Sequence, residues 1–428
     1  MTLLQIFLIS FVVLMILRMP LYLCLIGSSL LYFILNPHLS MMTAMSRMVN
    51  APNSFTLLAI PFFLFAAQVM NRGGVTTRIF HFATVLVGHF PGGLAYVNIL
   101  ASKLFAAGSG SALADVGSLG LIQVKAMRAD NYEDDIIIGV SAASATISPI
   151  TPPSIPFVIY GAMASVSIGA LFMAGVVPAF LIAIALCVKV FFIARKRKYK
   201  ASKRASFKEV WKAFRGAFWA LLFPVIIIGG IWSGVFTPTE AAFVSAIYGL
   251  FIAIFIYRDF KLREAPKLIV ETVMLIGPAI AAVVGAALFS WIMTYEQVDR
   301  FLINAIFNIS ENKFVVLLII NVCFLFIGMF LEVISAIMIM LPILIAISQT
   351  LGIDQVQLGV IVVLNLMIGL MTPPIGFSAF MLSTIANVPY GKTLKYCLPW
   401  IVPLLVVLML ITYFESFTLF LPRLLGFM

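Results

Sequence analysis

Charged side chains are scarce in this sequence. Only 10% of its 428 residues are Asp, Glu, Lys or Arg, whereas 63% are hydrophobic, and the mean hydropathy is +1.15. Water-soluble domains carry about 25% charged residues, so this chain has too few to cover a surface that faces water. Its apolar stretches are continuous rather than alternating, which excludes a membrane β-barrel. The composition therefore predicts an all-α polytopic membrane protein.

Residues that enzymes and ATP-driven machines need are also missing. The three histidines, His38, His81 and His89, form no His-Glu-x-x-His zinc motif. No Gly-x-x-x-x-Gly-Lys-Ser/Thr phosphate-binding loop is present, so the chain does not hydrolyse ATP itself. A membrane protease that pairs Ser109 or Ser111 with a histidine is the enzymatic alternative. We predict that the protein is not an enzyme.

Positive charge is concentrated rather than absent. Ten of the 27 Lys and Arg residues lie between positions 195 and 215, and a second group lies at 258–267. Positive residues in short loops mark the cytosolic side of a membrane, so both segments are expected there, with a helical hairpin between them. The first apolar run has no preceding positive charge and Arg18 follows it, which predicts an external N-terminus. Nucleic acid is not an expected partner, whereas membrane lipid is.

The two halves of the sequence resemble each other at a fixed shift of 221 residues. This shift carries the Thr-Pro-Pro motif at 151–153 onto the one at 372–374, and Pro178 onto Pro399. It also carries the polar break at 108–112 (GSGSA) onto the break at 329–333 (MFLEV). Three coincident features predict an internal duplication.

Each half contains a pair of short apolar runs that reads as a re-entrant hairpin, at about 94–127 and 314–348. The first pair ends at Lys125 and Arg128, which places its open end at the cytosol, whereas mixed charges that fit the outside flank the second. The hairpins would then enter from opposite faces. Inverted repeats of this kind are typical of secondary transporters.

Each hairpin is followed by a helix that is broken at Pro-Pro, at about 136–166 and 356–387. Proline removes an N–H group and disfavours helical geometry in the preceding residue, so both breaks free backbone carbonyl groups at mid-membrane. Unpaired oxygens cost several kcal/mol each in hydrocarbon, and a bound Na+ would satisfy them. The alternative is a structural kink that neighbouring Ser and Thr side chains satisfy. The predicted Na+ ligands are Ser109, Gly110, Ser111, Ser148, Pro149 and Thr151 at one site, and Gly328, Phe330, Met371 and Thr372 at the other.

Few acids lie inside the apolar runs, and these are Asp115, Glu240 and Glu332. Buried acids are functional candidates by default, and helix N-termini at the breaks favour an anionic substrate. We consider Glu332 and Asp115 as substrate contacts, with helix capping as the alternative for Glu332 and a structural role as the alternative for Asp115 and Glu240. Arg300 is a candidate counter-charge for a substrate carboxylate, with a solvated loop residue as the alternative.

Several of these motifs resemble the large membrane subunit of tripartite ATP-independent periplasmic (TRAP) transporters, over essentially the whole chain. The resemblance rests on "IPFFLFAAQVMNRGG" at 60–74, "GGLAYVNILASKLFAAGSGSALADVGSLG" at 92–120, "SPITPPSIPFVIYG" at 148–161, "FTPTEAAFVSAIYG" at 236–249, "LLIINVCFLFIGMFLEVISAIMIMLPIL" at 317–344 and "LGIDQVQLGVIVVLNLMIGLMTPPIGF" at 351–377. Glu332 stands where the family often has Asp.

The resemblance implies an elevator mechanism, in which a transport domain that holds both hairpins and both broken helices slides against a scaffold. It implies N-terminal scaffold helices at 1–53, a first inverted repeat at 54–195, a cytoplasmic basic loop at 196–216, a scaffold hairpin at 217–266 and a second inverted repeat at 267–428. A small four-helix membrane subunit and a periplasmic substrate-binding protein are the implied partners. The implied location is a bacterial inner membrane.

The expected activity is therefore Na+-coupled uptake of a small organic acid, either a sialic acid or a dicarboxylate. A single-component Na+/carboxylate symporter of the same superfamily is the alternative, and an ion channel is a third interpretation.

Overall fold

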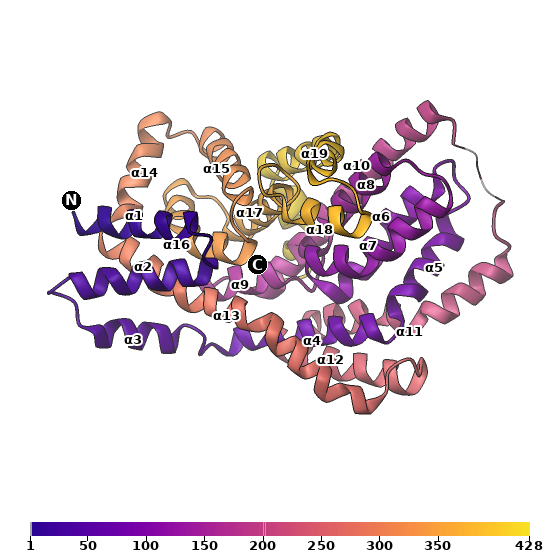
Figure 1. Ribbon diagram of the computed structural model, residues 1–428, viewed down its shortest axis with the longest axis horizontal. Helices are drawn as coiled ribbons and strands as arrows, with labels where there is room; N and C mark the ends of the chain where they lie inside the picture. Colours follow the sequence, from indigo (N-terminus) through magenta and orange to yellow (C-terminus); the bar gives the residue numbers. More distant parts are fainter. Residues whose placement is uncertain (1, 200, 202) are drawn as a thin grey trace.

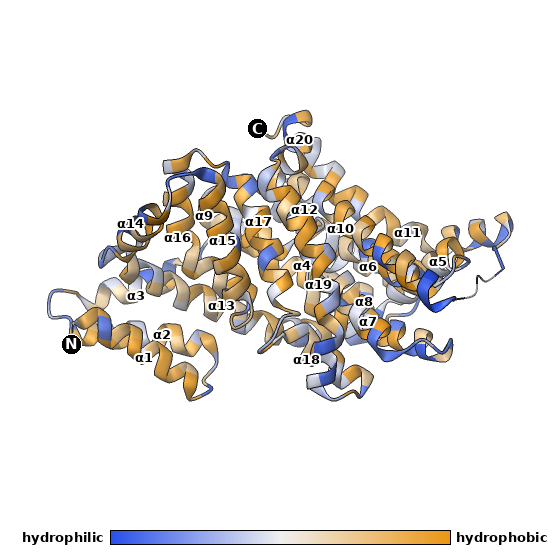
Figure 2. Ribbon diagram, turned by 90° about the horizontal axis from the view of Figure 1, so that it is seen from above, coloured by the Kyte–Doolittle hydropathy of each residue, from blue (hydrophilic) through white to orange (hydrophobic). Residues whose placement is uncertain are grey.

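The chain folds into a helical protein. The computed structural model describes residues 2–199, 201 and 203–428, and within these ranges every regular element is helical. Eight helices in this part of the chain are long and apolar enough to cross a membrane. Hydrophobic residues, drawn in orange, predominate along most helices in Figure 2. The prediction of an all-α polytopic membrane protein is confirmed.

The N-terminal part contains three helices that lie together at one end of the molecule (Figure 1). They are α1 (Leu3–Ile16), α2 (Leu21–Leu35) and α3 (Met41–Asn50). Thr2 and Gln5 form a capping box that starts α1. The short helix α3 was not expected, because its sequence "MMTAMSRMVN" carries no apolar run.

The first half continues with a helix pair, a hairpin and a broken helix. Its elements are α4 (Ala59–Arg72), α5 (Val75–Val87), α6 (Gly93–Ser109), α7 (Ala112–Ala129), α8 (Asp134–Ala145), α9 (Ile155–Ala164) and α10 (Ile168–Arg197). Helices α6 and α7 form the predicted first hairpin, and α8 and α9 form the predicted first broken helix. A 3-10 turn at Ser148–Ile150 lies between the last two.

The second half repeats this order. Its elements are α13 (Ala265–Tyr295), α14 (Val298–Ile309), α15 (Lys313–Gly328), α16 (Val333–Leu351), α17 (Gln355–Gly369), α18 (Phe377–Ala386), α19 (Tyr390–Tyr413) and α20 (Ser416–Leu424). The shift of 221 residues carries the first residues of α7 and α8 onto the first residues of α16 and α17. The repeat inferred from three short motifs thus extends to whole helices.

Two further helices, α11 (Phe207–Trp232) and α12 (Pro238–Phe251), join the halves. The predicted basic loop at 196–216 is mostly helical, which corrects that prediction. Helix α10 continues to Arg197, and α11 begins at Phe207 because Ser206 and Glu209 form a capping box. Glu240 forms a second capping box, with Thr237, at the start of α12. Glu240 therefore has a structural contact of the kind that its structural alternative expects.

The core of the molecule is built on the first halves of the two broken helices. All residues of α8 from Ile136 to Ala145 and all residues of α17 from Val356 to Gly369 are buried. Helices α7 and α19 pack on α8, and α15 and α19 pack on α17. This arrangement holds each broken helix between its hairpin and its neighbours, at the centre of the protein.

Candidate functional site

A cavity of about 560 Å³ lies where the two repeats meet. Its lining includes Gly110 and Ser111 from the first hairpin tip, Pro149 from the first break, and Glu332 and Ser335 from the second tip. Helices α2, α4 and α13 close it with mostly apolar side chains. The structure therefore brings three predicted ligands of the first Na+ site to one chamber with Glu332, whereas none of the predicted ligands of the second site, Gly328, Phe330, Met371 and Thr372, lines it.

The first hairpin tip lies directly on the first break. Gly110 has a φ of +59°, and a Cβ atom at this position would lie 2.5 Å from the carbonyl oxygen of Pro153. Ser109 donates a hydrogen bond of 3.1 Å to the carbonyl oxygen of Ser111. The side chain of Ser111 accepts a hydrogen bond of 3.4 Å from the backbone N–H of Ala114 and so caps α7. Only glycine permits both this close approach and this backbone conformation.

Asp115 carries a carboxylate oxygen without a donor. The residue is buried, with 1% of its surface exposed, and its Oδ2 atom accepts a hydrogen bond of 3.0 Å from Ser148. Its Oδ1 atom has no hydrogen-bond partner among the described residues. Ser102 lies beside it but donates its hydroxyl proton to Ser144. A buried carboxylate oxygen that accepts no hydrogen bond is a favourable ligand for a cation.

Asp115 was predicted as a substrate contact, and the geometry places it elsewhere. The cavity is lined by the residues at 112–114 and not by Asp115. The carboxylate instead joins the first hairpin to the first break through Ser148. Asp115 thus lies beside Ser148, a predicted ligand of the first Na+ site.

Thr151 binds a lysine that the sequence analysis overlooked. The Nζ atom of Lys103 donates a hydrogen bond of 3.1 Å to the Oγ1 atom of Thr151. The ammonium group also lies 4.5 Å from the ring centroid of Phe180. The sequence prediction named only acids as functional candidates inside the apolar runs. A lone lysine in the run at 94–107 is an equally strong indication of a functional site.

The second hairpin tip repeats the close packing of the first. The Cα atom of Gly369 lies 3.2 Å from the place that a Cβ atom of Gly328 would occupy, so the tip contacts the end of α17. Met371 is fully buried just beyond this contact, and Thr372 donates a hydrogen bond of 2.7 Å to the carbonyl oxygen of Ile368. The side chain of Phe330 is partly exposed. Both Pro-Pro bonds of the two breaks are cis.

Glu332 caps a helix and also lies in the wall of the cavity. Its Oε2 atom accepts a hydrogen bond of 3.0 Å from the backbone N–H of Ile334, and so the side chain caps α16. The residue also lines the cavity. The shift of 221 residues places Ser111, the cap of α7, at the equivalent position of the first repeat. One hydroxyl and one carboxylate therefore start the two helices that face this chamber.

Arg300 is not brought to the cavity. It lies exposed on α14, so the alternative of a loop residue is wrong, and it is not among the residues that line the chamber. The prediction that it balances a substrate carboxylate has no support in this arrangement.

Buried amide and hydroxyl groups tie each hairpin to its broken helix. In the first half, Asn98 donates to Ser141 at 2.7 Å and accepts from Ser144 at 2.8 Å. In the second half, Asn365 donates to Asn321 at 2.8 Å. The shift of 221 residues carries Ser144 onto Asn365. Each repeat thus joins the first helix of its hairpin to the first part of its broken helix through buried polar groups, although the Oδ1 atom of Asn365 has no hydrogen-bond partner among the described residues.

The donor set restricts the kind of ion that these sites can bind. No cluster of three or more His, Cys, Asp or Glu residues occurs in the part of the chain that the structure describes. The oxygen atoms at the two breaks are hydroxyl, carbonyl and carboxylate oxygens. Hard oxygen donors of this kind suit alkali and alkaline-earth cations rather than Zn²⁺ or Cu²⁺.

Comparison with known proteins places the chain in a family. Residues 8–417 match the family described as "Tripartite ATP-independent periplasmic transporter, DctM component". The sialic acid TRAP transporter large permease protein SiaM of Vibrio cholerae is 44% identical over 95% of this chain and 95% of its own length. The C4-dicarboxylate TRAP transporter large permease protein DctM of Pseudomonas aeruginosa is 40% identical over 89% of each chain.

The fold is shared with solved transporter structures of low sequence identity. The YdaH transporter of Alcanivorax borkumensis aligns with a TM-score of 0.68 at 14% identity, over 92% of this chain and 97% of that one. MtrF of Neisseria gonorrhoeae aligns with a TM-score of 0.57 at 11% identity, over 87% and 83%. The family match covers almost the whole chain and agrees with the resemblance seen in the sequence motifs. The chain belongs to the large permease (DctM) family of TRAP transporters.

Proposed function

We propose that this permease takes up a small organic acid across the bacterial inner membrane and that an inward Na+ gradient drives the uptake. The observation that carries the proposal is the cavity of about 560 Å³ between the two hairpin tips. Helices α7 and α16 both begin at its wall, and helix N-termini attract anionic groups. Its size lies within the usual range for small-molecule sites, roughly 300–1,000 Å³.

The chemistry of the cavity favours a sugar acid over a dicarboxylate. The start of α7 offers the Ser111 hydroxyl and backbone N–H groups to a carboxylate. Glu332 at the other tip is an acceptor that repels a second carboxylate and binds hydroxyl or amide donors. A sialic acid presents one carboxylate and many such donors, and the 44% identity to a sialic acid permease supports this choice. A C4-dicarboxylate is the second candidate, because a dicarboxylate permease is 40% identical.

Sodium coupling rests on the oxygen atoms at the breaks. In the first repeat, Ser148 donates a hydrogen bond to one carboxylate oxygen of Asp115, and the other oxygen, Oδ1, has no hydrogen-bond partner among the described residues. In the second, the tip at Gly328 contacts α17 immediately before Met371 and Thr372. A Na+ ion at the first place would satisfy the unpaired Oδ1 of Asp115, and an ion at each place would link ion binding to the position of each tip.

Transport by an elevator movement, with two separate partners, completes the proposal. The hairpins and broken helices would move as one transport domain, because the networks around Asn98 and Asn365 hold them together. Helices α1–α3, α11 and α12 would belong to the scaffold, which a small four-helix membrane subunit extends. A periplasmic substrate-binding protein would deliver the acid from outside.

The test is uptake into proteoliposomes that contain the permease, its small subunit and a loaded binding protein. We expect accumulation of labelled sialic acid under an inward Na+ gradient, and less accumulation of labelled succinate. Equal uptake after an ionophore collapses the gradient would contradict Na+ coupling. Uptake without either partner would favour a single-component symporter. Flux far above carrier rates would favour a channel.

A further inference from the structure

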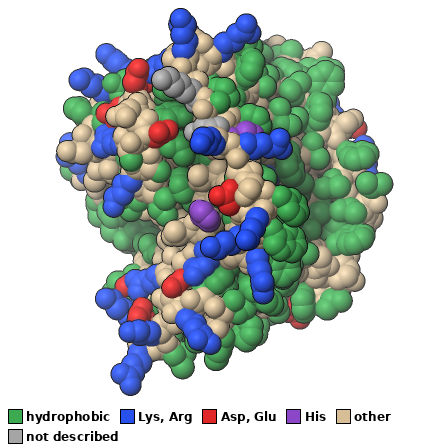
Figure 3. All heavy atoms as spheres, turned by 90° about the vertical axis from the view of Figure 1, so that its right-hand side faces the viewer, with side chains coloured by type: hydrophobic (Ala, Val, Ile, Leu, Met, Phe, Trp, Pro, Cys, Tyr) green, Lys and Arg blue, Asp and Glu red, His purple; other side chains and the backbone are tan. Residues whose placement is uncertain are grey.

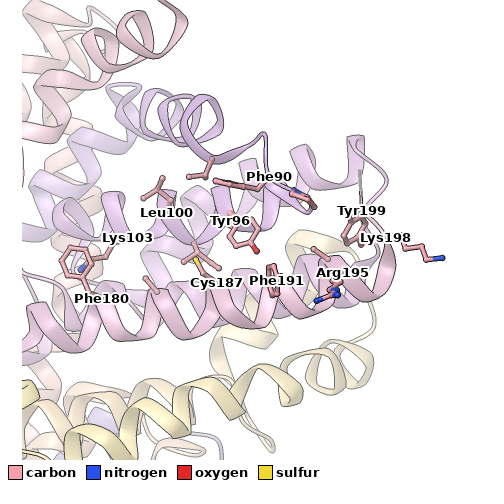
Figure 4. A pocket seen from close by; sticks show the side chains of 15 residues that line it. Phe90, Tyr96, Leu100, Lys103, Phe180, Cys187, Phe191, Arg195, Lys198 and Tyr199 are labelled. Carbon is pink, nitrogen blue, oxygen red and sulfur yellow. The ribbon is translucent and has the colours of Figure 1, made fainter. Parts of the chain in front are cut away.

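A second cavity, of about 890 Å³, lies away from the hairpin tips, between α6 and α10. Its lining is almost wholly apolar along its length, with Leu100, Phe180, Ala183, Cys187 and Phe191 among the side chains (Figure 4). The groove lies along α10, a helix that is apolar enough to span the membrane. The apolar walls of the groove are therefore suited to contact with lipid acyl chains.

The length of the groove matches one leaflet of a bilayer. Figure 4 shows Lys103 and Phe180 at one end and Arg195, Lys198 and Tyr199 at the other. The rise of α10 from Phe180 to Arg195 is roughly 22 Å at ~1.5 Å per residue. Half of a membrane with its headgroups is also about 20–22 Å thick. A lipid could lie in the groove at full length.

The charged end of the groove carries positive charge that the protein leaves unpaired. Neither the guanidinium group of Arg195 nor the ammonium group of Lys198 makes an ion pair or hydrogen bond with any residue that the structure describes. The nearby carboxylates of Glu133 and Asp135 pair with Arg197 instead. Basic side chains gather over this end of the molecule in Figure 3. Both side chains are exposed at the mouth of the groove and are available to an anionic group of a ligand.

Tyr199 closes the same end of the groove with an aromatic ring. The ring stacks on Tyr132, with centroids 4.7 Å apart, and so is held in position. Tyrosine rings are enriched at the level of lipid headgroups, which agrees with the basic side chains at this end.

We propose that this groove binds one anionic glycerophospholipid of the cytosolic leaflet. Arg195 and Lys198 hold its phosphate and headgroup beside the ring of Tyr199, and an acyl chain lies along α10 as far as Phe180. Lys103 at the inner end does not need a ligand, because its ammonium group already contacts the Thr151 hydroxyl and the Phe180 ring. The lipid would fill the space between α10 and the segment that joins α5 to α6.

Native mass spectrometry of the purified full-length permease tests the headgroup site. The protein is mixed with equal amounts of phosphatidylglycerol and phosphatidylcholine, and the retained lipid is counted. We expect one tightly retained phosphatidylglycerol per chain, preferred about tenfold over phosphatidylcholine. The double substitution Arg195→Gln and Lys198→Gln should reduce this preference to less than twofold.

A matched control removes the same charge elsewhere. Lys196→Gln together with Lys208→Gln should keep the preference, because neither lysine lines the groove. Equal losses in both double variants would overturn the proposal in favour of general attraction to a basic surface. Displacement of the lipid signal by inorganic phosphate would also overturn it, since the site would then bind the anion alone.

The apolar part is tested separately. Ala183→Trp fills the groove, whereas Ile184→Trp adds the same ring on the exposed outer face of α10. We expect loss of the retained phosphatidylglycerol in the first variant only, with unchanged elution and melting temperature in both. Retention in Ala183→Trp would overturn the proposed acyl-chain position. Cross-linking of Cys187 to the small membrane subunit, with no retained lipid, would replace the lipid by a protein occupant.

Discussion

Lys103 places its ammonium group 3.1 Å from the hydroxyl oxygen of Thr151, a residue of the first break. A positive charge therefore lies next to oxygen atoms that we propose as Na+ ligands. The same lysine lines the groove on the other side of α6. From this contact we predict that Lys103 lowers the affinity of the proposed first site for Na+.

Replacing Lys103 by Met should increase the affinity for Na+. The repulsion between the ammonium group and a Na+ ion a few ångströms away would be lost, so the half-saturating Na+ concentration should fall about five- to tenfold. The measurement is the Na+ dependence of thermal stabilisation of the purified permease, with choline as the reference cation. Lys103→Arg keeps the charge and should keep the wild-type value. An unchanged Na+ titration in Lys103→Met would exclude this repulsion.

Asp115→Asn should weaken Na+ binding at the first site. The substitution keeps the shape of the side chain but removes its charge, and it offers an N–H donor where the cation needs an acceptor. We expect the half-saturating Na+ concentration to rise at least tenfold in the same stabilisation assay. Asp130→Asn is the control, because Asp130 lies beyond the end of α7 and is exposed. Equal Na+ titrations for Asp115→Asn and the wild type would remove Asp115 from the ligand set.

Thr372→Val should reduce the Na+ dependence of uptake through the second site. The hydroxyl proton of Thr372 is donated to Ile368, which leaves its lone pairs for an ion. Loss of this oxygen should cost about 1–3 kcal/mol of Na+ binding. Thr384→Val on α18 removes a hydroxyl that makes a similar backbone contact, outside the break, and should have no effect. If both variants require the same Na+ concentration for uptake, Thr372 is not a ligand.

Asn365→Leu should destabilise the second repeat. Asn365 is fully buried and binds Asn321 of the hairpin, so the substitution leaves that amide oxygen without its donor. The expected loss is about 1–3 kcal/mol, seen as a lower melting temperature in detergent. Asn304→Leu on the exposed face of α14 is the matched control. Equal melting temperatures for both variants would show that the amide network does not hold the hairpin.

The sequence allowed much of the framework to be predicted. Continuous apolar runs indicate membrane helices, and proline pairs and glycine-rich tips mark interruptions that packing cannot remove. The 221-residue shift, found from a few motifs, holds for the first residues of α7 and α16. The prediction of a loop at 196–216 was wrong, because a capping box at Ser206 starts α11 within this segment.

The contacts within the site could not be predicted in the same way. Ser148 and Asp115 are 33 residues apart, and Lys103 and Thr151 are 48 apart, so their pairing depends on how the hairpin packs against the broken helix. Local patterns carry no information on such distances. Arg300 shows the reverse case. It was predicted to bind a substrate carboxylate because it is basic and lies among apolar residues, but it does not line the cavity.

The opposed entry of the two hairpins is the feature on which the whole transport scheme depends, and labelling of single cysteines tests it most directly. The four native cysteines are replaced by serine, and one cysteine is introduced at Lys125, near the end of the first hairpin, or at Lys313, at the start of the second. A membrane-impermeant maleimide is then applied to intact cells and to inside-out vesicles. The account predicts labelling at position 313 in cells and at position 125 in inside-out vesicles; labelling of both positions from one side would contradict it.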